Sequence, residues 1–366
     1  MSRSAHRLSD SGRPGFSLVD LAVLISIVVV GGAIAAPTLN GAWRDRLARL
    51  SANNLHVQGI GTSMYASDNA DRIPTYTWRG PVGTEPYVWY LLPDGNFKRA
   101  TSDQEAAALQ NQAILMEMTG RLKGPYKILG FSARIPHRRF VHLVLQAYLG
   151  AKTSGEMFVD PMDTNLLTWH RDELNYNAGS TVPYAPGEII QSGYEEDGYW
   201  ASKNMRQRWA FASSYATVPT AWLAQGDQVQ YAPIEDSMNL FMSTASGTPL
   251  PQGNTLGSVV FPANKVYIHE EYDRRNPLSN GRATVIPHYA YDAARPLKLM
   301  FDGSINDRPS GEGSSSYHPV KDTPWTQKYT PLHTFPLPFY GLGDPTPLDL
   351  RYRWTRGGLS GVDYTP

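Results

Sequence analysis

The stretch that decides the fold lies near the N-terminus, where GFSLVD at 15–20 precedes the apolar run LAVLISIVVVGGAIAA at 21–36 and then Pro37. No charged residue occurs between Leu21 and Trp43. A helix rises about 1.5 Å per residue, so a helix over this region approaches the ~30 Å thickness of a bilayer's hydrocarbon layer. The sequence therefore predicts a transmembrane helix here.

Basic residues flank this run on both sides, so the positive-inside rule does not settle its orientation. They are Arg3, Arg7 and Arg13 before it and Arg44, Arg46 and Arg49 after it. A cleaved secretory signal peptide is the alternative interpretation. Its cleavage site should follow the apolar run, whereas the suggestive tripeptide at 33–35 lies inside it, which favours a segment that stays on the protein.

Two residues distinguish this helix from an ordinary anchor. Asp20 puts a carboxylate at the start of the apolar run, at a cost of roughly 2.5–3.5 kcal/mol at mid-membrane and less near the interface. Such an acid usually has a partner, although an incidental acid at the membrane surface is the alternative. Pro37 removes a backbone hydrogen bond and predicts a kink or local melting of the helix.

Gly15, Phe16, the acid four residues later, the apolar helix and the proline resemble the N-terminus of type IV pilins and type II secretion pseudopilins. The resemblance implies that prepilin peptidase cleaves between Gly15 and Phe16 and methylates the new N-terminal amine. It also implies that the helix is retained as a membrane anchor and as the core of a filament. Asp20 stands where the family usually has Glu. Paired with the Phe16 ammonium, it would gain about 4 kcal/mol at an effective dielectric near 20.

A second helical segment follows Pro37. Apolar residues recur there at steps of three, four and seven, which predicts an amphipathic helix to about Asn69 with this stripe buried. The stripe comprises Leu47, Leu50, Val57, Ile60 and Met64. The two segments together predict one helix of about fifty residues from Phe16. Gly59 and Gly61 weaken the prediction of continuity, and an anchor followed by an unrelated soluble helix is the alternative.

The region 53–74 narrows the resemblance to large pseudopilin-like proteins of planctomycetes and related bacteria. Further similarity is confined to islands at 157–163, 214–216, 262–270 and 288–305. Those proteins often carry a His followed by Asp-Gly in the C-terminal domain. The corresponding residues here are His288, Asp302 and Gly303, with a longer gap between them than in the family.

The Asp302-Gly303 dipeptide lies between apolar segments at 297–301 and 304–305. This pattern predicts a β-hairpin with a two-residue turn in which both central residues have positive φ. A ligand or partner contact is the alternative role for these two residues.

The densest charge cluster, at 270–275 directly after the predicted strand, is interpreted as a solvated strand end with local arginine pairing. A calcium site or an acid–base pair is the alternative, but on a strand Glu270 and Glu271 would face opposite ways.

The sequence has no HExxH, GxSxG or phosphate-loop motif. We therefore expect no enzymatic activity, no cofactor and no metal site. The many Trp and Tyr residues favour ordinary packing, with a glycan-stacking surface as the alternative.

Composition excludes some partners and some chemistry for this 366-residue chain. The 33 Lys+Arg balance 33 Asp+Glu, so no basic surplus indicates nucleic acid as a partner. With no cysteine, disulfides, thiolate metal sites and cysteine nucleophiles are excluded. Helices are expected at 105–120 and 138–149 and a strand at 266–269.

The predicted organisation is a prepilin leader at 1–15, a transmembrane and amphipathic helix at 16–73, and a head at 74–366 with an irregular tail from about 311. The fold class is α+β and pilin-like, with a long N-terminal transmembrane α-helix packed on a β-containing globular head.

The resemblance implies a structural subunit of a type II secretion or type IV pilus-like filament. It would be a single-pass bacterial inner-membrane protein with its head in the periplasm or on the cell surface. Its partners would be prepilin peptidase, other pseudopilins and an inner-membrane assembly platform. The alternative is a membrane-anchored carbohydrate-binding protein or hydrolase.

Overall fold

The computed structural model divides the chain into two compact units, 1–46 and 47–366. The residues that it describes are 18–124, 127–128, 141–150, 156–163, 166–167, 171, 213–222, 231–233, 242–244, 254–274, 286–287, 292–317, 324, 326–329, 346–349 and 351–365.

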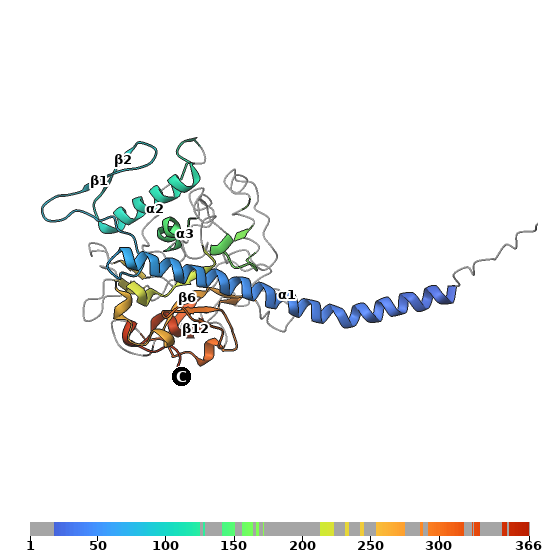
Figure 1. Cartoon of the computed structure of the whole chain (residues 1–366). Coiled ribbons are helices and arrows are strands. Elements are labelled where there is room, and N and C mark those ends of the chain that lie inside the picture. Colours follow the sequence, from blue (N-terminus) through green and yellow to red (C-terminus); the bar gives the residue numbers. More distant parts are fainter. Residues whose placement is uncertain are drawn as a thin grey trace, which may run out of the picture. The chain divides into compact units, whose positions relative to one another are not determined.

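One long helix, α1, runs from Leu18 to Asp68 (Figure 1). Nowhere among the described residues is a helix both long enough and apolar enough to cross a membrane. The predicted fold class, defined by a transmembrane helix, is therefore wrong. Over 41–68, which holds nearly all the described side chains of α1, the helix is too polar to enter a membrane, because Arg44, Asp45, Arg46 and Arg49 place four charges within six residues. The described residues of the head form both helices and strands, in an α+β arrangement.

The helix α1 is buried on a different face from the one predicted. Its buried side chains are Ser51, Leu55, Gln58, Thr62, Tyr65 and Ala66. By contrast, Leu50, Ile60 and Met64 are 45%, 48% and 45% exposed. The prediction that this apolar stripe is the buried one is wrong. The head presents polar as well as apolar groups to the helix, so polar side chains share the inward face with apolar ones.

Two glycines allow α1 to pack closely against its neighbours without interrupting the helix. A Cβ atom at Gly59 would lie 3.3 Å from Leu299 Cδ1, and one at Gly61 would lie 3.0 Å from Leu149 Cδ2. Both distances are shorter than ordinary van der Waals contact. The glycines that weakened the prediction of continuity are therefore the positions where two leucines approach the helix axis.

The central sheet of the head is antiparallel and has the strand order β10-β9-β6-β3 (Figure 1). Its strands are β3 (Tyr215–Thr217), β6 (Val266–Glu270), β9 (Lys298–Met300) and β10 (Ile305–Asn306). The strand predicted at 266–269 is confirmed. Leu55 of α1 belongs to the same buried cluster as side chains of β3, β6 and β9. That cluster forms the main core.

A second core lies around α2 (Asp103–Thr119), whose prediction at 105–120 is confirmed. Ser102 caps its N-terminus by accepting a hydrogen bond from the Glu105 amide, and Gly120 ends it in the left-handed conformation. The hairpin of β1 (Val88–Leu91) and β2 (Phe97–Ala100) packs beside α2. Of the helix predicted at 138–149, residues 141–149 are helical, as η2 (Val141–Leu145) and α3 (Gln146–Leu149), and 138–140 lie outside the described residues.

The remaining elements are short. Three further strand pairs are β4 (Tyr231–Pro233) with β5 (Met242–Thr244), β7 (Tyr272–Asp273) with β8 (Ile286–Pro287), and β11 (Thr326–Tyr329) with β12 (Thr346–Asp349). Single 3-10 turns are η3 (Glu156–Phe158), η4 (Pro219–Trp222), η5 (Leu256–Ser258), η6 (Pro262–Asn264), η7 (Ser310–Glu312), η8 (Arg351–Trp354) and η9 (Gly358–Ser360).

The C-terminal residues 351–365 belong to the main core, to which they contribute four large apolar side chains. These are Tyr352, Trp354, Leu359 and Tyr364. A fully buried ion pair between Lys265 and Asp363, 3.1 Å long, fixes the segment beside β6. Burial lowers the pKa of Lys265 and raises that of Asp363, while their mutual attraction opposes both shifts. This part of the expected irregular tail is ordered by what it packs against.

Candidate functional site: an outer stripe and groove on helix α1

The structure describes some of the predicted processing, assembly and hairpin residues and not others. Gly15, Phe16 and His288 lie outside the described residues. Asp20 and Pro37 both lie within α1. Asp302 and Gly303 are described in full, in the turn between β9 and β10.

Met300 and Ser304 still pair between β9 and β10, so the hairpin loop has three residues, Phe301, Asp302 and Gly303. The amide of Met300 donates to the Ser304 carbonyl at 2.9 Å, and the Gly303 amide donates to the Met300 carbonyl at 3.0 Å. The predicted hairpin is confirmed, but the two-residue turn is wrong, because of the three loop residues only Gly303 has a positive φ, at 87°. This pattern is that of a three-residue hairpin loop with glycine in the left-handed position. Oδ1 of Asp302 accepts bonds from the Ser304 amide (2.9 Å) and hydroxyl (2.6 Å).

The inner face of α1 is joined to the sheet by a buried hydrogen-bond network. The Ser51 hydroxyl donates to Glu270 Oε1 at 2.6 Å and lies 2.9 Å from the Tyr215 hydroxyl, which is therefore the donor to Ser51. The amide of Leu297 donates to Glu270 Oε2 at 2.7 Å. Burial raises the pKa of Tyr215 well above its ordinary value, and the charges of Asp160 and Glu270 raise it further. This tyrosine therefore stays protonated and acts as a donor.

The outer face of α1 carries an uncovered apolar stripe, which we call the outer stripe and define as Leu50, Val57, Ile60 and Met64. Three of its members are between 45% and 48% exposed. Single exposed apolar side chains are common, but these recur at helical spacing on one face. A contiguous apolar surface of this kind is typical of an interaction site.

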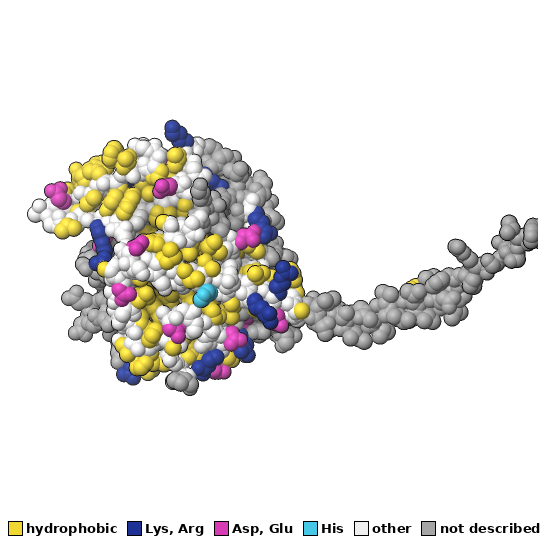
Figure 2. Space-filling view, viewed as in Figure 1, with side chains coloured by type: hydrophobic (Ala, Val, Ile, Leu, Met, Phe, Trp, Pro, Cys, Tyr) yellow, Lys and Arg dark blue, Asp and Glu magenta, His cyan; other side chains and the backbone are white. Residues whose placement is uncertain are grey.

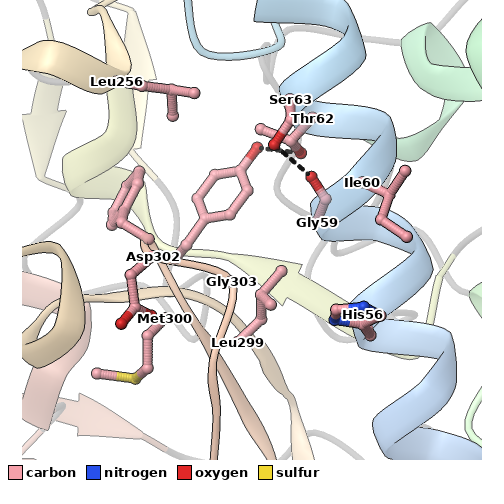
Figure 3. A pocket seen from close by; sticks show the side chains of 12 residues that line it. His56, Gly59, Ile60, Thr62, Ser63, Leu256, Leu299, Met300, Asp302 and Gly303 are labelled. Carbon is pink, nitrogen blue, oxygen red and sulfur yellow. Dashed lines mark hydrogen bonds between the residues drawn. The ribbon is translucent and has the colours of Figure 1, made fainter.

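A groove with a volume of about 230 Å³ lies beside the outer stripe (Figure 3). Its helix side is formed by α1 residues from His56 to Ser63, including Ile60, and its opposite side by the turn that bears Asp302 and Gly303. Tyr267 and Leu299 form part of the lining and are nearly fully buried. The hydroxyl groups of Thr62 and Tyr267 lie 3.3 Å apart within the lining. The groove is thus mainly apolar, with Asp302 as the one acidic side chain among its lining residues.

The charge cluster that begins at the last residue of β6 is buried, so its interpretation as a solvated strand end is wrong. Glu270, Glu271, Asp273 and Arg274 are each at most 7% exposed. The Arg274 guanidinium contacts Asp163 at 2.7 Å, and the Ser214 hydroxyl donates to the same carboxylate at 2.8 Å.

These contacts bring together three islands that the sequence resemblance had singled out. Residues from 157–163, 214–216 and 262–270 meet through the Ser214–Asp163 bond and the pairing of β3 with β6. Their polar side chains hold the head together around the inner face of α1.

The described residues offer a binding surface and no metal centre. No group of three or more His, Asp or Glu side chains among them is arranged to hold a metal ion. Comparison with known protein families, curated proteins and solved structures finds no match for the chain. A function for the chain is therefore inferred from the groove and the outer stripe.

Sequence reasoning found the stripe but assigned it to the wrong face of the helix, and it missed the groove. Periodicity shows that apolar side chains share a face, but it does not show whether that face is covered. The available signal was the polar series Ser51, Gln58 and Thr62, which has the same helical spacing on the other face.

Proposed function

We propose that this protein is a structural subunit of a pilus-like filament of the type II secretion or type IV pilus kind. In this proposal, prepilin peptidase cleaves between Gly15 and Phe16, and Asp20 pairs with the new Phe16 ammonium. The subunits associate through α1. The protein has no catalytic activity of its own, and its head lies outside the cytoplasm.

The observation that carries the proposal is the outer stripe of α1. A helix that only anchored its own head would have no need of an apolar face turned to solvent, since exposed apolar area costs about 25 cal/mol per Å² relative to burial. Helices that pack against one another meet through residues three and four positions apart. The spacing of Leu50, Val57, Ile60 and Met64 satisfies this requirement.

The inner network supports the same role, because it couples the helix firmly to the head. Ser51 and Thr62 reach Glu270 and Tyr267, which both belong to β6. A contact made by the outer face of α1 is therefore transmitted to the sheet. A filament subunit needs this coupling, since its helix positions its head.

Self-association of the purified full-length chain tests the assembly part of the proposal. The double variant Leu50→Asp/Met64→Asp puts two charges on the outer stripe outside the groove lining, and we expect at least a tenfold loss of self-association by analytical ultracentrifugation. Far-UV circular dichroism should be unchanged, since neither side chain is buried. Ser67→Asp, at an exposed polar position near the end of the same helix, is the charge control and should associate normally. A wild-type chain that stays monomeric at all concentrations would contradict the proposal.

Mass spectrometry of the N-terminal peptide tests the processing part. The chain is expressed in bacteria with and without prepilin peptidase, and the expected peptide begins at N-methylated Phe16 only when the enzyme is present. Asp20→Ala should be cleaved normally and fail to assemble. An intact Met1 start, or cleavage after Ala35 or Ala36, would refute the pilin-like function and favour an anchored or secreted binding protein.

A further inference from the structure

The β1–β2 hairpin presents an exposed aromatic face. Its register pairs Leu91 with Phe97 and Trp89 with Arg99, so these four side chains share one face of the ribbon. Trp89, Leu91 and Phe97 are 54%, 57% and 64% exposed. Hydrophobic side chains gather in Figure 2 at the end of the head where Figure 1 labels β1, β2 and α2.

The opposite face of the hairpin is fixed to the head, so the aromatic face is held in place. Tyr90 stacks on Trp78 with ring centroids 4.2 Å apart, and its hydroxyl accepts a bond from the Arg79 amide at 2.8 Å. At the hairpin's end, Lys127 pairs with Asp94. A rigid projecting face rich in Trp, Phe and Arg has the composition of a protein-binding hot spot.

The groove and the hairpin match in size and in charge. The groove is a hollow of about 230 Å³, and a cavity of roughly 150 Å³ already holds a benzene molecule. It therefore has room for the phenyl ring of Phe97, a residue that directly follows the hairpin loop. The acidic side chain on the groove's edge is Asp302, whereas the hairpin strands carry the exposed basic residues Lys98 and Arg99. The one acid of the hairpin loop, Asp94, is paired with Lys127.

We propose that the groove of one copy receives the β1–β2 hairpin of a second copy, with Phe97 in the hollow and Arg99 beside Asp302. This inference rests on the proposed filament function and names the contact between neighbouring heads. The groove and the hairpin are different parts of one chain, so the contact between two copies is heterologous. Each contact uses the groove of one copy and the hairpin of the next, which leaves one surface of each copy open for a further copy. Such a contact extends an assembly, as a filament requires.

The chain contains no cysteine, so engineered disulfides report this contact directly. Asn96→Cys and Ser304→Cys are made in separate full-length chains, next to Phe97 and Asp302 respectively. Mixed under mild oxidation, they should give a cross-linked heterodimer whose joined peptides are identified by mass spectrometry. Val82→Cys, at an 82% exposed position, is the control and should not cross-link to Ser304→Cys.

A charge-reversal cycle tests the pairing chemically. Phe97→Ala should weaken self-association about thirtyfold, the size of a hot-spot loss. Arg99→Asp should weaken it about fivefold, as expected for an exposed ion pair. Combining Arg99→Asp with Asp302→Arg should restore most of that loss, and Asp302→Asn, which keeps the turn's acceptor oxygen, is the control for turn geometry.

The outcomes separate this contact from the function on which it rests. If the outer-stripe variant Leu50→Asp/Met64→Asp abolishes assembly while Phe97→Ala and Arg99→Asp leave it unchanged, the hairpin contact is refuted and the filament function stands. If the wild-type chain does not self-associate, both are refuted. Binding of the monomeric chain to a soluble polysaccharide such as cellulose oligomers, lost in Trp89→Ala, would assign the aromatic face to glycans and overturn the contact.

Discussion

The two faces of α1 differ in a way that is unusual for a surface helix. The face against the head mixes apolar and polar side chains, among them Leu55, Ser51 and Thr62, whereas the solvent face carries Leu50, Ile60 and Met64. A helix stabilised by its own head alone would turn mainly polar residues to solvent. The exposed apolar residues are therefore open to another surface, while hydrogen bonds from the inner polar residues help to specify how α1 sits on the head.

This division has a physical consequence for specificity. Apolar contacts are non-directional and tolerate sliding, whereas a buried hydrogen bond loses its partner when the register shifts. The Ser51–Glu270 bond at 2.6 Å therefore fixes the register of the helix on the sheet. The outer stripe, free of such restraints, is suited to a partner that arrives after folding.

The largest expected effect contrasts two leucines on opposite faces. Leu55 is fully buried and Leu50 is 45% exposed. Leu55→Ala should lower the free energy of unfolding by about 3 kcal/mol through lost burial and a residual cavity. Leu50→Ala should change it by less than about 0.5 kcal/mol. Urea denaturation of the full-length chains measures both, and equal losses would show that the two faces are not distinguished.

The next prediction compares two glycines of α1, one in close contact with a neighbouring side chain and one without neighbours. Gly61→Ala should destabilise the fold by roughly 0–2 kcal/mol, because crowding of the new methyl group against Leu149 outweighs the gain of about 1 kcal/mol in helix propensity. The control is Gly41→Ala, where no atom lies within 4 Å of the added carbon. That change should stabilise the helix by about 0.5–1 kcal/mol, since alanine is the better helix former. Thermal unfolding of the two variants should shift in opposite directions.

A smaller effect distinguishes hydroxyl groups on the two faces. Ser51→Ala removes a donor to Glu270 and an acceptor for Tyr215, and should lower the free energy of unfolding by about 1–2 kcal/mol. Ser63 is exposed, and its hydroxyl bonds back to the Gly59 carbonyl at 3.2 Å, so Ser63→Ala should be neutral within about 0.5 kcal/mol. If denaturation shows Ser51→Ala to be as neutral as Ser63→Ala, the inner network does not fix the helix.

The smallest effect is a pH dependence in the hairpin proposed to cover the groove. Burial by itself would raise the pKa of Asp94, but hydrogen bonds from Lys127 and Asn96 outweigh it and lower the pKa to about 2. The pKa of an Asp in an unfolded chain is about 3.9. The lowered pKa therefore contributes stability that is present above about pH 4 and is lost as the pH falls toward 2.

Carboxyl NMR titration checks this shift directly. Lys127→Ala should move the pKa of Asp94 upward, toward that of an unfolded chain. An Asp94 pKa that does not respond to Lys127→Ala would show that this pair does not hold the end of the hairpin.

Part of the fold and part of the site could be predicted from the sequence. Local signals sufficed for α2, which was predicted at 105–120 and ends before Gly120, and for the β9–β10 hairpin, where Asp302-Gly303 marks the turn. They did not show that the turn has three residues, because its length depends on which strand residues pair. They also gave no sign that the Glu270 cluster is buried, since its partners Ser51 and Leu297 are distant in sequence.

The sequence by itself determined that the 47–68 segment is a helix with two chemically different faces, because side-chain periodicity is a local property of the chain. It also determined the absence of cysteine chemistry and the balance of charge. Only the tertiary structure decided which face of that helix turns inward, because burial depends on the groups that residues far along the chain present to it. Tyr215, Tyr267 and Glu270 present hydroxyl and carboxylate groups, so the face that carries Ser51 and Thr62 was buried and the apolar stripe was left beside an open groove.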